Sequence, residues 1–206
     1  MEIGLLVLAA GQSSRMTGTH KLLRPWPSQH GGTTVIEHVF ETLILAHTWS
    51  SVRCVLPPIP RALSHLIEPI IGVENCVLNP HPEEGKGSSI ALGVASFPSG
   101  LDGVVICLAD LPLLTKEIVR IIVQKAKLQR IVMPVTSEGP RHPIFFASDY
   151  LESFKSLRYD QGGKRIIEEH SNDIIKIRFD DSTPFEDIDN EASYRRALGI
   201  AHASII

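Results

Sequence analysis

Apolar residues follow two different spacings near the start of the chain. The segment Ile3–Ala9 is a continuous apolar run that stops at a glycine, which is typical of a strand buried on both faces of a sheet. The period then changes, because the apolar positions from Val35 to Ile44 fall on one face of a helix. Thr34 and Glu37 have the spacing of a capping box, so this helix is predicted to begin directly after Thr34.

Strands and helices are predicted to alternate along the rest of the chain. The further predicted strands are Ser51–Leu56, Asn75–Leu78, Gly103–Leu108, Arg130–Pro134, Pro143–Ala147 and Ile174–Phe179. The further predicted helices are Arg61–Ile67, Ser88–Ser96, Lys116–Leu128, Lys164–Glu169 and Glu191–Leu198. This alternation indicates βαβ units, a mostly parallel sheet and a three-layer α/β/α architecture. The pattern loosens after residue 135, so we expect a single domain over residues 1–206 whose later part is irregular and lies on the substrate side.

Composition narrows the class of protein. The chain has 206 residues, in which 20 Lys and Arg against 23 Asp and Glu give a formal charge of −3. This mild acidity and the 6% of aromatic residues exclude a nucleic-acid binder that works through a strongly basic face or a platform of stacked bases. The first apolar run is too short to span a membrane, and the sparse cysteines favour a reducing compartment. We therefore expect a cytoplasmic protein that binds neither nucleic acid nor membrane.

The loop after the first predicted strand is suited to anion binding. Small residues around Gly11 let backbone N–H groups approach phosphate oxygens, and Arg15 and Lys21 add positive charge. The loop matches neither GxxxxGK[ST] nor GxGxxG, so a P-loop NTPase and the usual dinucleotide fingerprint are both disfavoured. The alternative is that Gly11 only makes a turn and that both cations are solvated.

The same loop carries a more specific resemblance. Residues 8–16, LAAGQSSRM, followed by Gly18 and by KLL at residues 21–23, resemble the signature of the MobA-like nucleotidyltransferases, and within them most closely the molybdenum cofactor cytidylyltransferases. Further motifs of that family have counterparts in the expected order at Thr34–Val39, Asn79–Ile90, Leu108–Pro112, Arg141–Phe146, Asp160–Arg165 and Asp187–Asp189. The resemblance covers roughly residues 3–198, almost the whole chain.

The chain also departs from the family pattern. Thr17 stands where glycine is usual, although Gly18 follows at once, and Arg141 replaces the glycine that precedes His-Pro. Asn190 and Glu191 replace a frequent Thr-Pro. Because Arg141 lies where the family meets its second substrate, this change bears on the acceptor more than on the chemistry.

The resemblance implies a fold, a reaction and a cofactor. The fold is a Rossmann-like domain of the nucleotide-diphospho-sugar transferase type, with a nucleotide-binding part over about residues 1–134 and an acceptor-side part over about residues 135–198. In the implied reaction a phosphate monoester attacks the α-phosphorus of a nucleoside triphosphate, and pyrophosphate leaves. The nucleophile is already an anion, so catalysis consists of positioning and of charge neutralisation by backbone donors, cations and Mg²⁺ held by carboxylates.

The resemblance also assigns roles to individual residues. The implied catalytic residues are Arg15, Lys21 and Asp110, and Asp110 is expected to bind Mg²⁺ together with Asp189, with Asp187 as the alternative. The implied nucleotide-binding residues are Leu8, Ala9, Ala10, Gly11, Ser13, Arg15, Lys21, Gly87, Ser88 and Ser89. The implied acceptor-binding residues are His142, Pro143, Asp160, Gly163 and Arg165.

Structural roles stay open for several of these residues. Asp110 has the alternative of a turn, and Ser88 and Asp189 have the alternative of a helix N-cap. Lys86 has the alternative of a solvated charge, and His20, like the histidines at positions 38 and 47, is interpreted as a surface residue.

Ala10 bears on the choice of nucleotide. Cytidylyl relatives tend to carry Leu-Ala-Ala-Gly and guanylyl relatives Leu-Ala-Gly-Gly, so Ala10 favours CTP. A methyl group at position 10 would crowd a purine base, and one such group changes the free energy of discrimination by about 1–3 kcal/mol. The expected partners are CTP, a molybdopterin-type cofactor and a molybdenum hydroxylase as recipient. The alternatives are a different phosphorylated alcohol as acceptor, and a non-catalytic maturation factor that binds the cofactor for such a hydroxylase.

Overall fold

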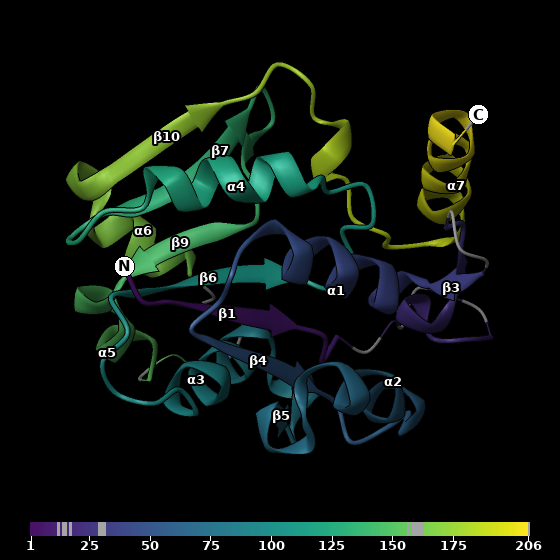
Figure 1. Ribbon diagram of the computed structural model, residues 1–206, viewed down its shortest axis with the longest axis horizontal. Coiled ribbons are helices and arrows are strands. Elements are labelled where there is room, and N and C mark those ends of the chain that lie inside the picture. Colours follow the sequence, from purple (N-terminus) through teal and green to yellow (C-terminus); the bar gives the residue numbers. More distant parts are fainter. Residues whose placement is uncertain are drawn as a thin grey trace.

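A mixed, mostly parallel sheet forms the centre of the protein (Figure 1). The computed structural model describes residues 1–11, 13, 16, 18–28, 32–155, 157 and 163–205. The strands of the sheet, in spatial order, are β10 (Ile174–Arg178), β7 (Ile131–Thr136), β9 (Ile144–Ala147), β6 (Gly103–Leu108), β1 (Ile3–Leu8), β4 (Ser51–Leu56) and β5 (Cys76–Leu78). A short strand, β8 (Gly139–Pro140), pairs with β7, and β2 (Pro25–Trp26) pairs with β3 (Thr33–Thr34) in a separate two-stranded sheet.

The order of the strands creates a switch point beside β1. Strand β1 pairs in parallel with β4 on one side and with β6 on the other. The chain first runs outward from β1 through β4 to β5 and then returns to form β6. Strand β9 is antiparallel to both of its neighbours, β6 and β7. Ligands of open α/β sheets bind beyond the carboxyl ends of the strands at such a switch point, which here lies beyond Leu8 and Leu108.

Helices cover both faces of the sheet, so the three-layer prediction is confirmed (Figure 1). One layer holds α1 (Val35–Ala46), α2 (Ala62–Ile71) and α4 (Lys116–Lys125), and the other holds α3 (Lys86–Ala95) and α5 (Leu151–Phe154). The remaining helices are α6 (Lys164–Glu169) and α7 (Glu191–Ile205). Among the residues that the structure describes, no helix combines the length and the apolar character that crossing a membrane requires.

Local signals explain where several elements begin. The predicted capping box of α1 is present, since Thr34 accepts a hydrogen bond from the Glu37 amide while the Glu37 carboxylate accepts one from the Thr34 amide. Strand β1 is buried on both faces, with Leu5, Leu6 and Val7 fully shielded from solvent. The close approach of α3 to the sheet depends on Gly93, where a Cβ atom would lie 2.4 Å from Cδ1 of Leu6.

Several boundaries differ from the prediction. Helix α2 continues to Ile71 in spite of Pro69, and ends at Gly72, whose φ of 88° suits a residue without Cβ. Helix α3 begins two positions before Ser88, at Lys86. Helix α7 extends through the segment after Leu198, for which the sequence predicted no element.

Candidate functional site

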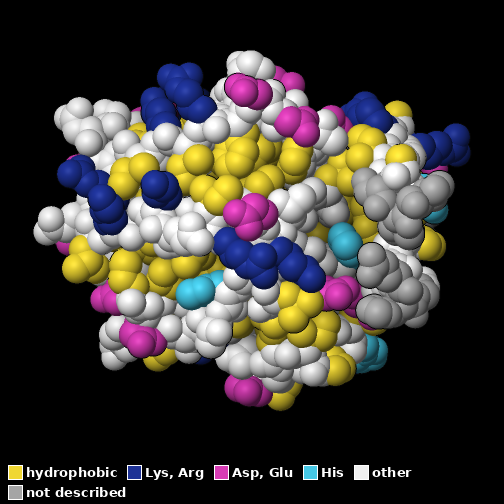
Figure 2. Space-filling model, turned by 45° about the horizontal axis from the view of Figure 1, so that its top comes forward, with side chains coloured by type: hydrophobic (Ala, Val, Ile, Leu, Met, Phe, Trp, Pro, Cys, Tyr) yellow, Lys and Arg dark blue, Asp and Glu magenta, His cyan; other side chains and the backbone are white. Residues whose placement is uncertain are grey.

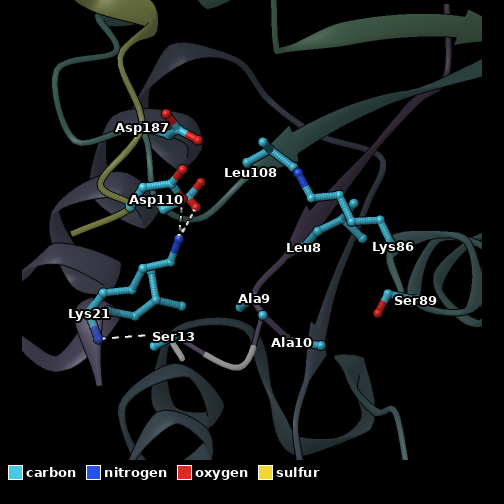
Figure 3. Close-up of a pocket in the computed structure, with 13 residues that line it drawn as sticks. Leu8, Ala9, Ala10, Ser13, Lys21, Lys86, Ser89, Leu108, Asp110 and Asp187 are labelled. Atoms are coloured by element: carbon cyan, nitrogen blue, oxygen red, sulfur yellow. Dashed lines mark hydrogen bonds and ion pairs between the residues drawn. The ribbon is translucent and has the colours of Figure 1, made fainter. Parts of the chain in front are cut away.

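A pocket opens where β1 and β6 end (Figure 3). This first pocket has a volume of about 250 Å³. Its lining consists of Leu8, Ala9, Ala10, Gly11, Ser13, Lys21, Leu22, Lys86, Ser89, Leu108, Asp110, Asp187 and Asp189. Most residues predicted to bind nucleotide therefore meet at one concave surface, at the switch point of the sheet.

The loop after β1 is held by polar contacts at both of its ends. The amide of Lys21 donates to the hydroxyl of Ser13 (3.3 Å), which adopts a left-handed φ of 51°. The ring of His20 donates from Nε2 to the Gly11 carbonyl (2.9 Å) and accepts at Nδ1 from the Leu22 amide (3.3 Å). Burial lowers the pKa of His20, and acceptance of the Leu22 hydrogen bond at Nδ1 requires the neutral ring. His20 is thus half-buried in the site and is not the surface residue that the sequence suggested.

Lys21 lies among carboxylates rather than in solvent. Its side chain is 11% exposed, and Nζ lies 2.5 Å from Oδ2 of Asp110 and 3.7 Å from Oδ1 of Asp189. Eighty-nine positions of the chain separate Lys21 from Asp110. The alternative of a solvated Lys21 is therefore wrong. Arg15, the second predicted cation of this loop, lies outside the described residues.

Three carboxylates converge around this ammonium group. One oxygen from each of Asp110, Asp187 and Asp189 lies within 4.8 Å of the other two. Partial burial and the charges of Asp110 and Asp189 raise the pKa of the Asp187 carboxyl, and Lys21 opposes this shift. With all three carboxylates ionised, three negative charges and one positive charge leave the cluster at −2.

The cluster fits the divalent cation that the resemblance implies. Carboxylate oxygens are the ligands that Mg²⁺ prefers in proteins. Oδ1 of Asp110 is buried and has no hydrogen-bond partner among the described residues, although an unpaired buried oxygen is costly. Asp110, Asp187 and Asp189 are thus the residues that would hold the ion. The sequence offered Asp187 only as an alternative to Asp189, whereas the structure places both in the cluster.

Helix α7 positions the two later aspartates. The cap of this helix is Asn190, whose side chain accepts from the Ser193 amide (3.0 Å), so the alternative of Asp189 as the N-cap is wrong. Arg24 forms a two-pronged contact with Glu191 (3.1 and 3.0 Å). Tyr194 donates to the Pro25 carbonyl (2.6 Å). These contacts tie the start of α7 to the segment that follows Lys21, and so bring the carboxylates to the loop.

The start of α3 forms another wall of the first pocket. Ser89 lines the pocket, whereas Gly87 and Ser88 do not. The amide of Asn79, a residue 1% exposed, donates to the hydroxyls of Ser88 (3.2 Å) and Ser89 (2.9 Å). Ser88 in turn donates to the Gly85 carbonyl (2.9 Å), and Gly85 occupies the N-cap position. The alternative of Ser88 as the N-cap is therefore wrong.

A second pocket adjoins the first. It has a volume of about 330 Å³, and the two pockets share Leu8, Lys86 and Leu108. Its other lining residues are Ile90, Ile106, Pro140, Arg141, His142, Ile144, Phe146, Phe154, Gly163, Lys164 and Ile167. The wall is thus largely apolar, and among the described residues every charged side chain that lines it is basic.

Only some of the residues predicted to bind the acceptor line this second pocket in the described part of the chain. His142 and Gly163 line it, and Nδ1 of His142 donates to the Ile106 carbonyl (3.1 Å). Burial lowers the pKa of His142, so its ring stays neutral. Pro143 is buried and lines neither pocket, and Arg165 turns away to pair with Glu169 at 2.7 Å. Asp160 lies outside the described residues.

The face shown in Figure 2 has no large surface patch of only one sign of charge. Lys and Arg side chains there lie scattered among acidic and hydrophobic ones. This mixture agrees with the formal charge of −3.

Sequence reasoning missed three contributors to the site. His20 had been interpreted as a surface residue, Lys86 had been given no role beyond the alternative of a solvated charge, and Asn79 had no role beyond its place in a family motif. The position of His20 directly before Lys21, in a loop already assigned to anions, was the available signal. Asn79 follows a predicted strand and precedes a proline, which marks it as a turn residue but does not reveal that it supports two serines.

Comparison with known proteins agrees with this geometry. A family model described as the MobA-like NTP transferase domain matches residues 5–174. The chain is 28% identical to the purine catabolism protein PucB of Bacillus subtilis, over 93% of this chain and 95% of that protein. It is 26% identical to a probable molybdenum cofactor guanylyltransferase of Mycobacterium bovis, over 91% and 89%. Its fold is similar to that of a nucleotidyl transferase from Methanothermobacter thermautotrophicus, with a TM-score of 0.83, 19% identity and coverage of 98% and 99%.

The family match spans most of the chain and contains the loop after β1, Lys21 and Asp110. The structural similarity extends over nearly the whole of both chains. The chain therefore belongs to the MobA-like NTP transferase family, whose members are nucleotidyltransferases.

Proposed function

We propose that this nucleotidyltransferase moves CMP from CTP to the phosphate monoester of a molybdopterin-type cofactor and releases pyrophosphate, with Mg²⁺ as the metal. The observation that carries the proposal is the position of Lys21 among Asp110, Asp187 and Asp189 in a pocket that adjoins a second one. Two neighbouring pockets suit a reaction between two substrates, and a cation among carboxylates suits a site that handles phosphates.

The chemistry requires no general base. An oxygen of the acceptor phosphate forms a bond to the α-phosphorus, the bond from the α-phosphorus to the bridging oxygen breaks, and its electron pair leaves with pyrophosphate. A bound Mg²⁺ would offset negative charge on the phosphate oxygens. Lys21 binds phosphate oxygen with its ammonium group, and the backbone N–H groups of Gly11 and Ser13 donate hydrogen bonds. His20 keeps that backbone in place through the Gly11 carbonyl and the Leu22 amide.

The choice of CTP rests on the size of the first pocket near Ala10. Ala10 is 4% exposed and lines this pocket together with Ala9 (Figure 3). Its methyl group takes space that a purine needs and a pyrimidine does not. The competing donor is GTP, because one relative is named as a molybdenum cofactor guanylyltransferase.

The second pocket supports a cofactor with a ring system and a phosphate as the acceptor. Its apolar wall includes Phe146 and Phe154, and the charged side chains that line it are basic in the described part of the chain. Residues 135–198 do not form this wall alone, since Leu8, Lys86 and Ile90 also contribute. We accordingly assign nucleotide binding mainly to residues 1–134, completed by Asp187 and Asp189, and acceptor binding to both parts of the chain.

A direct test combines binding with turnover. Thermal unfolding is measured with CTP, GTP, ATP, UTP and NAD, each with and without Mg²⁺, and pyrophosphate release is then measured with molybdopterin. The expected result is a Mg²⁺-dependent stabilisation that is largest with CTP, followed by pyrophosphate release that needs both CTP and molybdopterin. Stabilisation by CTP without turnover would favour a non-catalytic maturation factor, turnover with GTP would replace the donor, and a response to NAD alone would overturn the proposal.

A further inference from the structure

Lys86 occupies the boundary between the two pockets. Of the residues that the structure describes, Leu8, Lys86 and Leu108 alone line both, and Lys86 is the single charged residue among these three. It is the first residue of α3, and its side chain extends over Leu8 toward Leu108, so that its nitrogen points to the side of the pocket that holds Asp110 (Figure 3). A group that bridges the two substrates would meet Lys86 from either pocket.

The ammonium group of Lys86 has no acidic partner among the described residues, whereas the neighbouring cations do. Lys21 contacts two carboxylates of the cluster. Arg141 pairs with Glu138, and Lys164 lies 3.7 Å from Glu168. Among the described basic side chains that line the second pocket, Lys86 alone forms no ion pair with a described carboxylate, so its charge is available to a ligand.

The reaction places an unusual demand on this boundary. The attacking phosphate and the α-phosphate are both anions, and they must approach to the distance at which a bond forms. A cation between them lowers their repulsion and orients the attacking oxygen. Lys21 and the three carboxylates lie on the nucleotide side, and the neutral ring of His142 supplies no charge on the other. Lys86 is the side chain whose position and charge meet this demand.

We propose that Lys86 binds the phosphate monoester of the acceptor and holds it beside the α-phosphate of the nucleotide. This role deepens the proposed function and rests on it. The amino end of α3 adds a favourable dipole for an anion in the same place. The ligand class is a phosphate monoester carried on an apolar ring, since the phosphate meets Lys86 and the ring meets the wall formed with Phe146 and Phe154.

A binding experiment tests Lys86 without knowledge of the natural acceptor. Phenyl phosphate is the probe, and phenol is the same ring without the phosphate. Calorimetry of the full chain should show that Lys86→Met weakens phenyl phosphate binding about tenfold or more, the usual effect of losing a hydrogen bond to a charged group. Phenol binding should not change, and Lys86→Arg should restore most of the phosphate affinity.

Lys116→Met is the matched control. Lys116 is also the first residue of a ten-residue helix, α4, and lines neither pocket. This variant should bind phenyl phosphate, and CTP with Mg²⁺, like the wild type. With molybdopterin as acceptor, Lys86→Met should raise the KM for the acceptor and lower kcat.

Defined results would overturn the inference. They are wild-type affinity of Lys86→Met for phenyl phosphate, an equal loss of phenol binding, or no phenyl phosphate binding by the wild type. These results differ from failure of the proposed function. That failure would appear as an absence of CTP turnover in the wild type, whatever the effect of Lys86→Met on phenyl phosphate binding.

Discussion

Replacing Asp110 with asparagine separates the catalytic role of the carboxylate cluster from its role in stability. Asparagine keeps the size of the side chain and an oxygen that accepts a hydrogen bond from Lys21. It removes one of the three charges that would hold a divalent ion. It also removes a charge that raises the pKa of Asp187, so part of the lost attraction to Lys21 is offset by lower repulsion.

The magnitudes follow from these contacts. A hydrogen bond to a charged group contributes about 1.5–3 kcal/mol and a neutral one about 1 kcal/mol, so the apo variant should lose about 1 kcal/mol of unfolding free energy. For a domain of this size that loss lowers the Tm by about 2–4 °C. At a Mg²⁺ concentration of 100 times its Kd, the wild type gains about 2.7 kcal/mol, whereas a Kd weakened about a hundredfold leaves the variant about 0.4 kcal/mol.

The assay is thermal unfolding of both proteins with and without Mg²⁺, followed by pyrophosphate release. The wild type should rise by about 5–11 °C with Mg²⁺ and the variant by no more than about 2 °C. Turnover of the variant should fall by about 10²–10³-fold or more. Asp180→Asn is the matched control, because Asp180 is an exposed aspartate outside the cluster, and it should respond to Mg²⁺ like the wild type.

An equal response to Mg²⁺ in the wild type and in Asp110→Asn would refute the reasoning, because the orphaned oxygen of Asp110 would then have no part in holding the ion. A fall in Tm of more than about 10 °C without Mg²⁺ would also contradict it, since the aspartate would then act mainly on the fold.

Further outcomes are expected from other parts of the site. Ala10→Gly should lower the ratio of kcat/KM for CTP over GTP by about 5–150-fold, the value of one methyl group, and an unchanged ratio would contradict the size argument. His20→Ala should raise the KM for CTP about 5–10-fold for each hydrogen bond lost to Gly11 and Leu22, while His20→Gln, whose amide nitrogen reaches the position of Nε2, should recover part of the loss. Because burial holds the pKa of His142 below its ordinary 6.5, the unfolded chain binds a proton that the folded chain does not once the pH falls below 6.5. The unfolding free energy should therefore decrease from pH 7 to pH 5, and denaturant unfolding of His142→Gln should show a shallower decrease.

The architecture was predictable because its signals are local. The apolar run of β1, the capping box of Thr34 and Glu37, and the alternation of strand and helix all report contacts between near neighbours or burial on a fixed face. Boundaries were less predictable where tertiary contacts extend an element. Helix α2 continues past Ile67 through Pro69, and α7 runs to Ile205.

The candidate site was predictable in part for the same reason. The loop after β1 and the aspartate after β6 were recognisable from their place at strand ends, and the order of the strands then put Lys21 against Asp110. The acceptor side was less predictable, since Arg165 forms a surface ion pair with Glu169 and Pro143 is buried and lines neither pocket.

The sequence by itself determined the layers of the fold, the family, and the positions of the loop after β1 and of the first carboxylate, Asp110. Only the tertiary structure decided that Asp187 and Asp189 share one cluster, that His20 joins the two ends of the loop, and that Lys86 lies between two pockets. The physical reason is distance along the chain. Side chains separated by more than a hundred positions meet only because contacts such as Arg24 with Glu191 dock α7 beside the loop, and no local pattern of residues encodes where that docking places a carboxylate.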